Sequence, residues 1–128
     1  MKKLNFIVDS QRSNASKIKN ILIQKKYKIR DVPEHSFETC DAVVFFAENK
    51  QKAISIRNKL LKCNISTKIL PEAMSWHFAE SWDHIDELKN DSKMPNLEIS
   101  RNILERAVAL PVFVKMKDDY FNSLKSVL

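Results

Sequence analysis

The sequence contains no glycine in its 128 residues, although average usage of about 7% would give roughly nine. Glycine lets the backbone approach a phosphate closely and adopt positive φ without a steric penalty. Its absence excludes the glycine-rich phosphate loops of P-loop nucleotidases, dinucleotide-binding domains and protein kinases. A phosphate-bearing cofactor therefore has no recognisable binding motif in this chain.

Cysteine is scarce, and long apolar runs are missing. The two cysteines, Cys40 and Cys63, have neither the density of a disulfide scaffold nor CxxC spacing. We therefore expect free thiols and a cytoplasmic protein. No stretch approaches the roughly 18 apolar residues of a membrane-spanning helix, and the N-terminal segment becomes polar too soon for a signal peptide. We expect no membrane partner.

Positive charge is in excess but is not concentrated. Lys and Arg number 22 against 16 Asp and Glu, which gives a formal net charge of +6. The basic residues are spread along the chain, without long runs and without interleaved aromatic side chains. We interpret them as a solvated surface and expect no nucleic-acid partner; a nucleic-acid-binding function would require steeply salt-dependent affinity.

The first half of the chain predicts a helix followed by a strand–helix–strand unit. Apolar residues at three- and four-residue steps indicate a long helix from about Lys2 to Gln24. A short extended piece follows at Lys28 to Val32, and the apolar run Ala42 to Ala47 indicates a buried central strand. Asn49 is placed to cap a helix that ends at Cys63 and Asn64, with Asn64 in the left-handed position. Ile65 to Leu70 then predicts a second strand, completing a βαβ-like unit.

The second half adds two helices and an extended segment. We expect a helix from Asn96 or Leu97 to about Ala109, followed by an extended Leu110 to Val114 in which Pro111 suits a sheet edge or a strand start. Asp118 to Val127 predicts a closing helix. The fold class is α+β, a single domain with a long helix over residues 1–26 and a small sheet with helices on one face over residues 27–128.

Side chains able to take part in catalysis or ligand binding are densest between Thr67 and His84, where two tryptophans and two histidines lie close together in the sequence. One interpretation is a ligand wall, because Trp offers a flat apolar surface to a sugar or acyl chain and His offers donors to hydroxyls or phosphate. Its candidate substrate-binding residues are Lys68, Trp76, His77, Trp82 and His84. The alternative is structural: Trp76, Phe78 and Trp82 belong to the core and the histidines are surface residues.

Two other kinds of site have less support. His77 and His84 are two helical turns apart, or about 10 Å along an axis, too far for one Zn²⁺. A nucleophile such as Cys63 or Ser75 could pair with His77, but no spacing predicts that contact. We name no catalytic residue and no metal ligand.

Four segments together resemble a known family. They are QRSN in the long helix, AVVFFAE, STKILPEAMSWHFAESWDHI and ERAVALPVFVKM. In this order they are similar to the C-terminal part of the DegT/DnrJ/EryC1/StrS aminotransferases, the pyridoxal-phosphate enzymes that aminate sugars, and most of all to members in sugar-acid and lipopolysaccharide pathways. The resemblance spans about Leu4 to Leu128, and it matches Ala109-Leu110-Pro111 to the family's Ser-Leu-Pro turn, with Ala in place of Ser.

The resemblance implies a role for the chain and a partner. It implies that the small α+β domain packs over the active site and that the loop facing the substrate includes the following residues: Thr67, Lys68, Pro71, Trp76, His77, Trp82 and His84. The family's large domain, which holds pyridoxal phosphate on a Schiff-base lysine, has no counterpart in these 128 residues. We therefore expect this chain to bind no cofactor and to be inactive alone, and to need a large domain or subunit, a sugar or nucleotide-sugar substrate and a homo-oligomer.

An alternative function for the chain is not enzymatic. The chain could be a standalone interaction module that self-associates through its N-terminal helix, because a helix that has lost a partner leaves apolar residues such as Ile7, Val8 and Ile18 partly uncovered.

Overall fold

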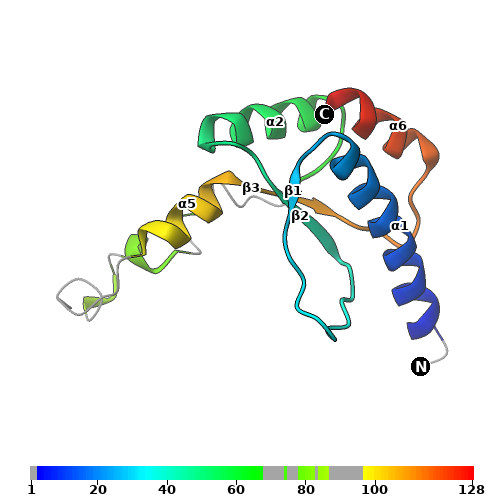
Figure 1. The fold of residues 1–128 in the computed structure, drawn as a ribbon, viewed down its shortest axis with the longest axis horizontal. Coiled ribbons are helices and arrows are strands. Elements are labelled where there is room, and N and C mark those ends of the chain that lie inside the picture. The colour runs from blue at the N-terminus through cyan, green and yellow to red at the C-terminus, as the bar shows by residue number, and fades with distance from the viewer. Residues whose placement is uncertain (1–2, 68–73, 75–77, 83, 87–96) are drawn as a thin grey trace.

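The computed structural model describes residues 3–67, 74, 78–82, 84–86 and 97–128, and its order of elements is that of an α+β domain. Figure 1 shows α1, α2 and α6 together on one side of the sheet, whereas α5 leads away from it. The elements are α1 (Leu4–Gln24), β1 (Lys28–Ile29), β2 (Ala42–Phe46), α2 (Lys50–Lys62), the 3-10 helix η1 (Ala79–Ser81), α5 (Glu98–Arg106), β3 (Ala107–Pro111) and α6 (Asp118–Val127).

The described sheet has three antiparallel strands in the order β1-β2-β3. The apolar run predicted as a central strand is therefore confirmed as the middle strand. Its burial alternates, because Val43 and Phe45 are buried while their neighbours are half-buried. Val43 pairs with Leu110 and Phe45 with Val108, so these four side chains share one face.

The core lies between that face and the three helices. α1 contributes Ile18 and Leu22, and α2 contributes Leu60, all with no measurable exposure. α6 begins and ends as predicted and buries Phe121 and Leu124. Apolar residues at helical spacing on three segments thus meet one sheet face, as expected for the predicted fold class.

α1 matches the predicted helix, but one of its residues is not where we expected it. Ile18 is fully buried, whereas Ile7 is 38% exposed and Val8 is half-buried. The expectation that Ile18 is uncovered was therefore wrong, because this part of α1 packs against the sheet and α6.

Turns that usually take glycine use other residues here. Lys26, His35, Cys40 and Asn64 have φ between 56° and 65°. Lys26 and Asn64 each follow the end of a helix in a Schellman arrangement: the amides of Tyr27 and Ile65 donate to the Leu22 and Leu60 carbonyls, at 3.0 and 2.9 Å. The left-handed role predicted for Asn64 is confirmed.

The capping of α2 is also confirmed, but the strand predicted after it is not. Asn49 precedes α2 and its side chain accepts a 2.8 Å hydrogen bond from the Lys52 amide. Residues 65–67 form no strand, and residues 68–70 lie outside the described residues. Ile65 is apolar because it packs into the core directly after the helix cap. The described strands include no parallel pair, because β2 pairs with β1 and β3 in antiparallel fashion, and the βαβ-like unit stays a prediction.

The boundary between α5 and β3 lies earlier than predicted. We expected a helix to about Ala109 and an extended segment from Leu110, whereas α5 ends at Arg106. Ala107 and Val108 pair with Phe46 and Phe45, so the β2 ladder overrides the helical spacing of these residues. Pro111 ends β3 on an edge strand of the described sheet, one of the two places predicted for it.

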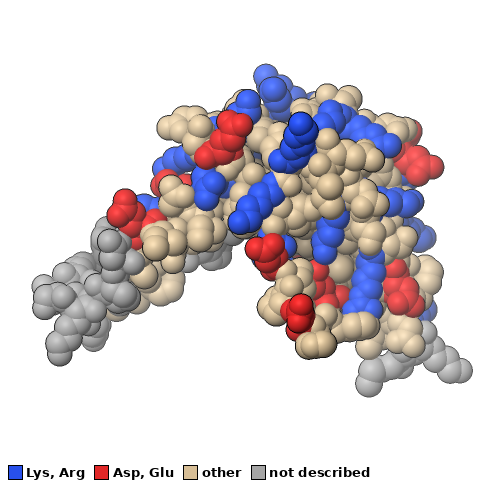
Figure 2. All heavy atoms as spheres, in the orientation of Figure 1, with Lys and Arg blue, Asp and Glu red and all other residues tan. Residues whose placement is uncertain are grey.

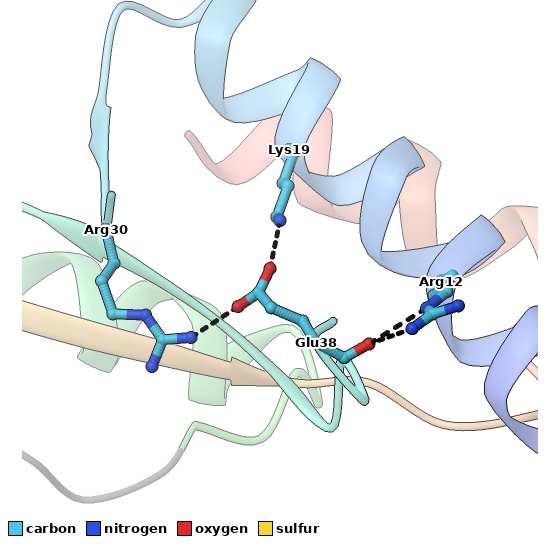
Figure 3. Close-up of polar contacts among 4 residues, drawn as sticks. All are labelled: Arg12, Lys19, Arg30 and Glu38. Atoms are coloured by element: carbon cyan, nitrogen blue, oxygen red, sulfur yellow. Dashed lines mark hydrogen bonds and ion pairs between the residues drawn. The ribbon is translucent and has the colours of Figure 1, made fainter. Parts of the chain in front are cut away.

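The connection between β1 and β2 is fastened to α1 through Glu38 (Figure 3). One carboxylate oxygen accepts from Lys19 Nζ at 2.9 Å and the other from Arg30 Nη2 at 2.6 Å. The backbone carbonyl of Glu38 accepts from Arg12 Nε and Nη2 at 3.0 and 2.9 Å. Arg12 also lies over the Phe37 ring, 3.1 Å from its centroid. These contacts hold an irregular segment without secondary structure of its own.

We expect Glu38→Gln to lower the free energy of unfolding by about 1 kcal/mol at neutral pH, because both ion pairs lose their charge. The hydrogen bond from Lys19, with that from Arg30, holds the pKa of Glu38 below its usual 4.5. A depressed pKa stabilises the folded state above the unfolded value, and this contribution is lost as pH falls through the folded value. Urea unfolding as a function of pH checks this: the difference between wild type and variant should shrink below pH 4.5. A constant difference would contradict it.

No helix in the described part of the chain combines the length and the apolar character needed to cross a bilayer.

Candidate functional site

The structure describes only part of the predicted ligand wall. Lys68, Trp76 and His77 lie outside the described residues. Trp82 follows η1 and is half-buried, its amide donating to the Ala79 carbonyl at 3.0 Å. His84 is exposed. Two of the five predicted residues are therefore placed, near one another in sequence and accessible to a ligand or to another domain.

Phe78 fits the structural interpretation of the aromatic residues. Its side chain is only 5% exposed, and the guanidinium carbon of Arg101, a residue of α5, lies 5.0 Å from the centroid of its ring. A cation over an aromatic face contributes about 0.5–2 kcal/mol. Phe78 thus links this segment to α5, whereas Trp82 and His84 keep accessible side-chain surface.

Thr67, at the start of the segment, has an unusual environment. Its Oγ1 atom is buried and has no hydrogen-bond partner among the described residues. A buried hydroxyl without a partner costs about 1–3 kcal/mol, so such groups in native proteins call for an explanation. A polar group of a ligand or of another domain that reaches Oγ1 would provide one.

The described residues do not assemble the other sites considered. Cys63 is a free, exposed thiol, whereas its possible partner His77 and the alternative nucleophile Ser75 lie outside the described residues. Within the described ranges, no three His, Cys, Asp or Glu side chains are grouped as metal ligands. The pairing of a nucleophile with His77 stays untested.

The helix N-termini bear on the fit of pyridoxal phosphate, whose phosphate group is typically held by free backbone amides at such a terminus. The first turn of α2 is capped by its own Asn49 side chain. The first turn of α5 carries Glu98, and the first turn of α6 carries Asp118 and Asp119. The negative charges of these residues repel a phosphate. These three termini do not fit the cofactor's phosphate group, and we derive no reaction step through it.

A basic cleft that we did not predict lies elsewhere. It has a volume of about 540 Å³ and is lined by residues from the end of α1, from β1, from the end of β2 and from α5. Its cations are Lys26, Lys28, Arg30 and Arg106. Alternation along an extended backbone puts Lys28 and Arg30 on one face, so the spacing K-x-K-x-R was the available signal. Arg106 joins them only through the tertiary fold.

Comparison with known proteins gives the fold. No family model matches this chain. A crystal structure described as a DegT DnrJ EryC1 StrS aminotransferase from Brucella abortus is similar to it with a TM-score of 0.67 and 15% sequence identity. The match covers 94% of this chain and 30% of the aminotransferase chain, so the present chain spans less than a third of its neighbour. The fold of this chain is thus that of a portion of an aminotransferase.

Proposed function

We propose that this chain is the small domain of a pyridoxal-phosphate-dependent sugar aminotransferase of the DegT/DnrJ/EryC1/StrS family, acting in the cytoplasm in the synthesis of lipopolysaccharide or other cell-surface sugars. The observation that supports this most is the fold match, which includes 94% of this chain at a TM-score of 0.67. The segment STKILPEAMSWHFAESWDHI, which resembles the same family, supports it from the sequence.

In this proposal the chain forms the substrate side of a composite active site. Trp76 and Trp82 offer flat surfaces to a sugar or nucleotide-sugar, while His77 or His84 donates a hydrogen bond to its hydroxyl or carboxylate groups. Lys68 adds a positive charge. The cofactor and its Schiff-base lysine come from the large domain or subunit, and the complete enzyme is a homo-oligomer. The chain alone does not transaminate.

The test is reconstitution. The chain is co-expressed with a large domain of this family from the same source, and amino-group transfer to a keto-sugar is measured. We expect activity only when both parts are present, and we expect His77→Ala to lower kcat/KM because it removes a contact to the substrate. An inactive but stable assembly of the two parts would overturn the proposed function, and unchanged kinetics would remove His77 from the site.

Thr67→Val gives a sharper prediction, because valine has nearly the same shape without the hydroxyl. In the isolated chain the buried Oγ1 has no partner within the described ranges, so we expect the variant to be as stable as wild type or about 1 kcal/mol more stable. In the reconstituted enzyme we expect a lower kcat/KM, because the hydroxyl then has a partner.

Thermal unfolding of the chain and kinetics of the assembly separate the two effects. Loss of stability in the isolated variant would show that Thr67 has a structural role instead. Ser66→Ala, at the neighbouring exposed position, is the control and should change neither quantity.

One observation favours the alternative function, a self-associating interaction module. The first two turns of α1 expose Leu4, Phe6 and Ile7, at 52%, 62% and 38%. Apolar side chains grouped at one helix end favour contact with a second copy. Sedimentation of the purified chain tests this: the module is dimeric at high concentration and Phe6→Ser weakens the dimer, whereas a strict monomer would exclude it.

A further inference from the structure

The basic cleft has the size of a small-molecule site, and part of its lining is apolar. Its volume of about 540 Å³ lies within the roughly 300–1,000 Å³ of ligand pockets. Phe46, at the end of β2, and Ile103, on α5, supply aromatic and aliphatic surface. Ile103 is 42% exposed, and none of the described residues of α5 is buried. This apolar surface is therefore available to a ligand.

The cations of the cleft exceed its carboxylates. Four basic side chains line it against two acidic ones, Asp31 and Glu48. Within the described residues, neither carboxylate forms an ion pair with Lys26 or Lys28, and both ammonium groups lack an ion-pair partner. Part of this excess is already offset, because Arg30 is paired with Glu38. The ammonium groups of Lys26 and Lys28, with three N–H donors each, are available to a ligand's oxygens.

The two arginines of the cleft are held in place by contacts that do not involve Lys26 or Lys28. Arg30 Nη2 donates to Glu38 at 2.6 Å, and that carboxylate is in turn held by Lys19 (Figure 3). Arg106 Nε donates to the Asn102 carbonyl at 3.3 Å, and its Nη1 to the Ala47 carbonyl at 3.4 Å. A guanidinium that is already oriented loses less conformational freedom when it binds an anion.

The backbone conformation at Lys26 is set by the end of α1. Lys26 has φ 63°, in the left-handed region where glycine is the favoured residue. Its peptide continues the Schellman arrangement that ends α1 and directs the following chain into β1. A lysine here is strained by about 1–2 kcal/mol relative to a right-handed position, and the end of the helix accounts for this φ as it does for that of Asn64 after α2.

The surroundings extend the positive potential. A neighbouring hollow of about 310 Å³ shares Lys26, Phe46 and Glu48 with the cleft and adds Lys25 and Lys52. Figure 2 shows Lys and Arg side chains in the middle of the visible face, where Figure 1 places the end of α1 and β1. Such a surface attracts anions before they make contact.

We propose that this cleft binds a phosphomonoester with an aromatic or apolar body. A phosphomonoester carries about −1.5 to −2 charges at neutral pH, which complements the excess of basic over acidic side chains along the cleft. Its phosphate oxygens take the donors of Lys26, Lys28 and the arginines, and its body lies on Phe46 and Ile103. This inference does not depend on the proposed aminotransferase function, since none of the described lining residues belongs to the Thr67–His84 segment.

The binding experiment uses phenyl phosphate as the probe, with amide chemical shifts of the full chain as the readout. We expect saturable shifts at Lys26, Lys28 and Arg106, weaker binding of inorganic phosphate and no binding of phenol. Binding should weaken as salt rises and as pH falls below the phosphate's second pKa of about 6. Equal affinity for inorganic phosphate would overturn the role of the apolar lining residues. Tighter binding of a DNA oligonucleotide would overturn the small-molecule assignment.

Lys26→Gly separates binding from folding. Glycine relieves the left-handed strain, so we expect the variant to unfold at a higher temperature and yet bind phenyl phosphate about tenfold more weakly. Asn64→Gly is the matched control, because Asn64 holds the same position after α2, outside the cleft. It should leave the affinity unchanged. Lys28→Gln should weaken binding without added stability. Unchanged affinity in both lysine variants would overturn the proposal.

Discussion

Phe45→Ala should lower the free energy of unfolding by about 4 kcal/mol, because it leaves a cavity at the centre of the core. Phe45 lies in the middle strand, has no exposed surface and faces the helices. Its ring also meets Tyr27 edge to face, with the centroids 5.0 Å apart. Since domains of this size are stable by only about 5–15 kcal/mol, a loss of this size is a large fraction of the stability.

Urea denaturation at equilibrium measures this loss, and Phe113→Ala is the matched control. Phe113 is 52% exposed, so the same truncation there should cost less than about 1 kcal/mol. If both variants lost equal stability, Phe45 would not occupy the centre of the core.

The second large effect is expected at Asn14, the buried polar residue of α1. Its side chain is 8% exposed and its Nδ2 donates to the carbonyls of Phe113 and Val114, at 2.9 and 3.3 Å. These bonds tie α1 to the segment between β3 and α6. Asn14→Ala removes both and leaves two partly buried carbonyls without this donor, so we expect a loss of about 2 kcal/mol.

Asn102→Ala is the control for that variant. Asn102 also lies within a helix, but its side chain is exposed. Because alanine is the better helix former, this change should be neutral or slightly stabilising. A neutral Asn14→Ala would mean that the two carbonyls find other donors and that α1 is not fastened at this point.

Local sequence signals were sufficient for much of the fold. Asn49 and Asn64 mark both ends of α2 because capping and left-handed turns depend on a few neighbouring residues. The helix α6 was predicted to the residue from its apolar spacing. An unbroken apolar run likewise identified β2.

The predictions that failed concern features that depend on residues far apart in the sequence. Ala107 and Val108 fit a helix by spacing and became a strand because β2 pairs with them. Ile65 is buried by a helix cap and not by a sheet. The basic cleft combines Lys28 with Arg106, which are far apart in the chain and meet only in the folded protein. Most of the predicted ligand wall, including Trp76 and His77, lies outside the described residues and stays a prediction.

We propose that this chain is one part of an aminotransferase, and the DNA upstream of the Met1 codon tests this proposal most directly. We predict that this region, in frame or as a neighbouring gene, encodes a cofactor-binding large domain with a glycine-containing lysine loop of the pyridoxal-phosphate type. If it encodes nothing of this kind, the proposal that the chain is one part of such an enzyme is contradicted.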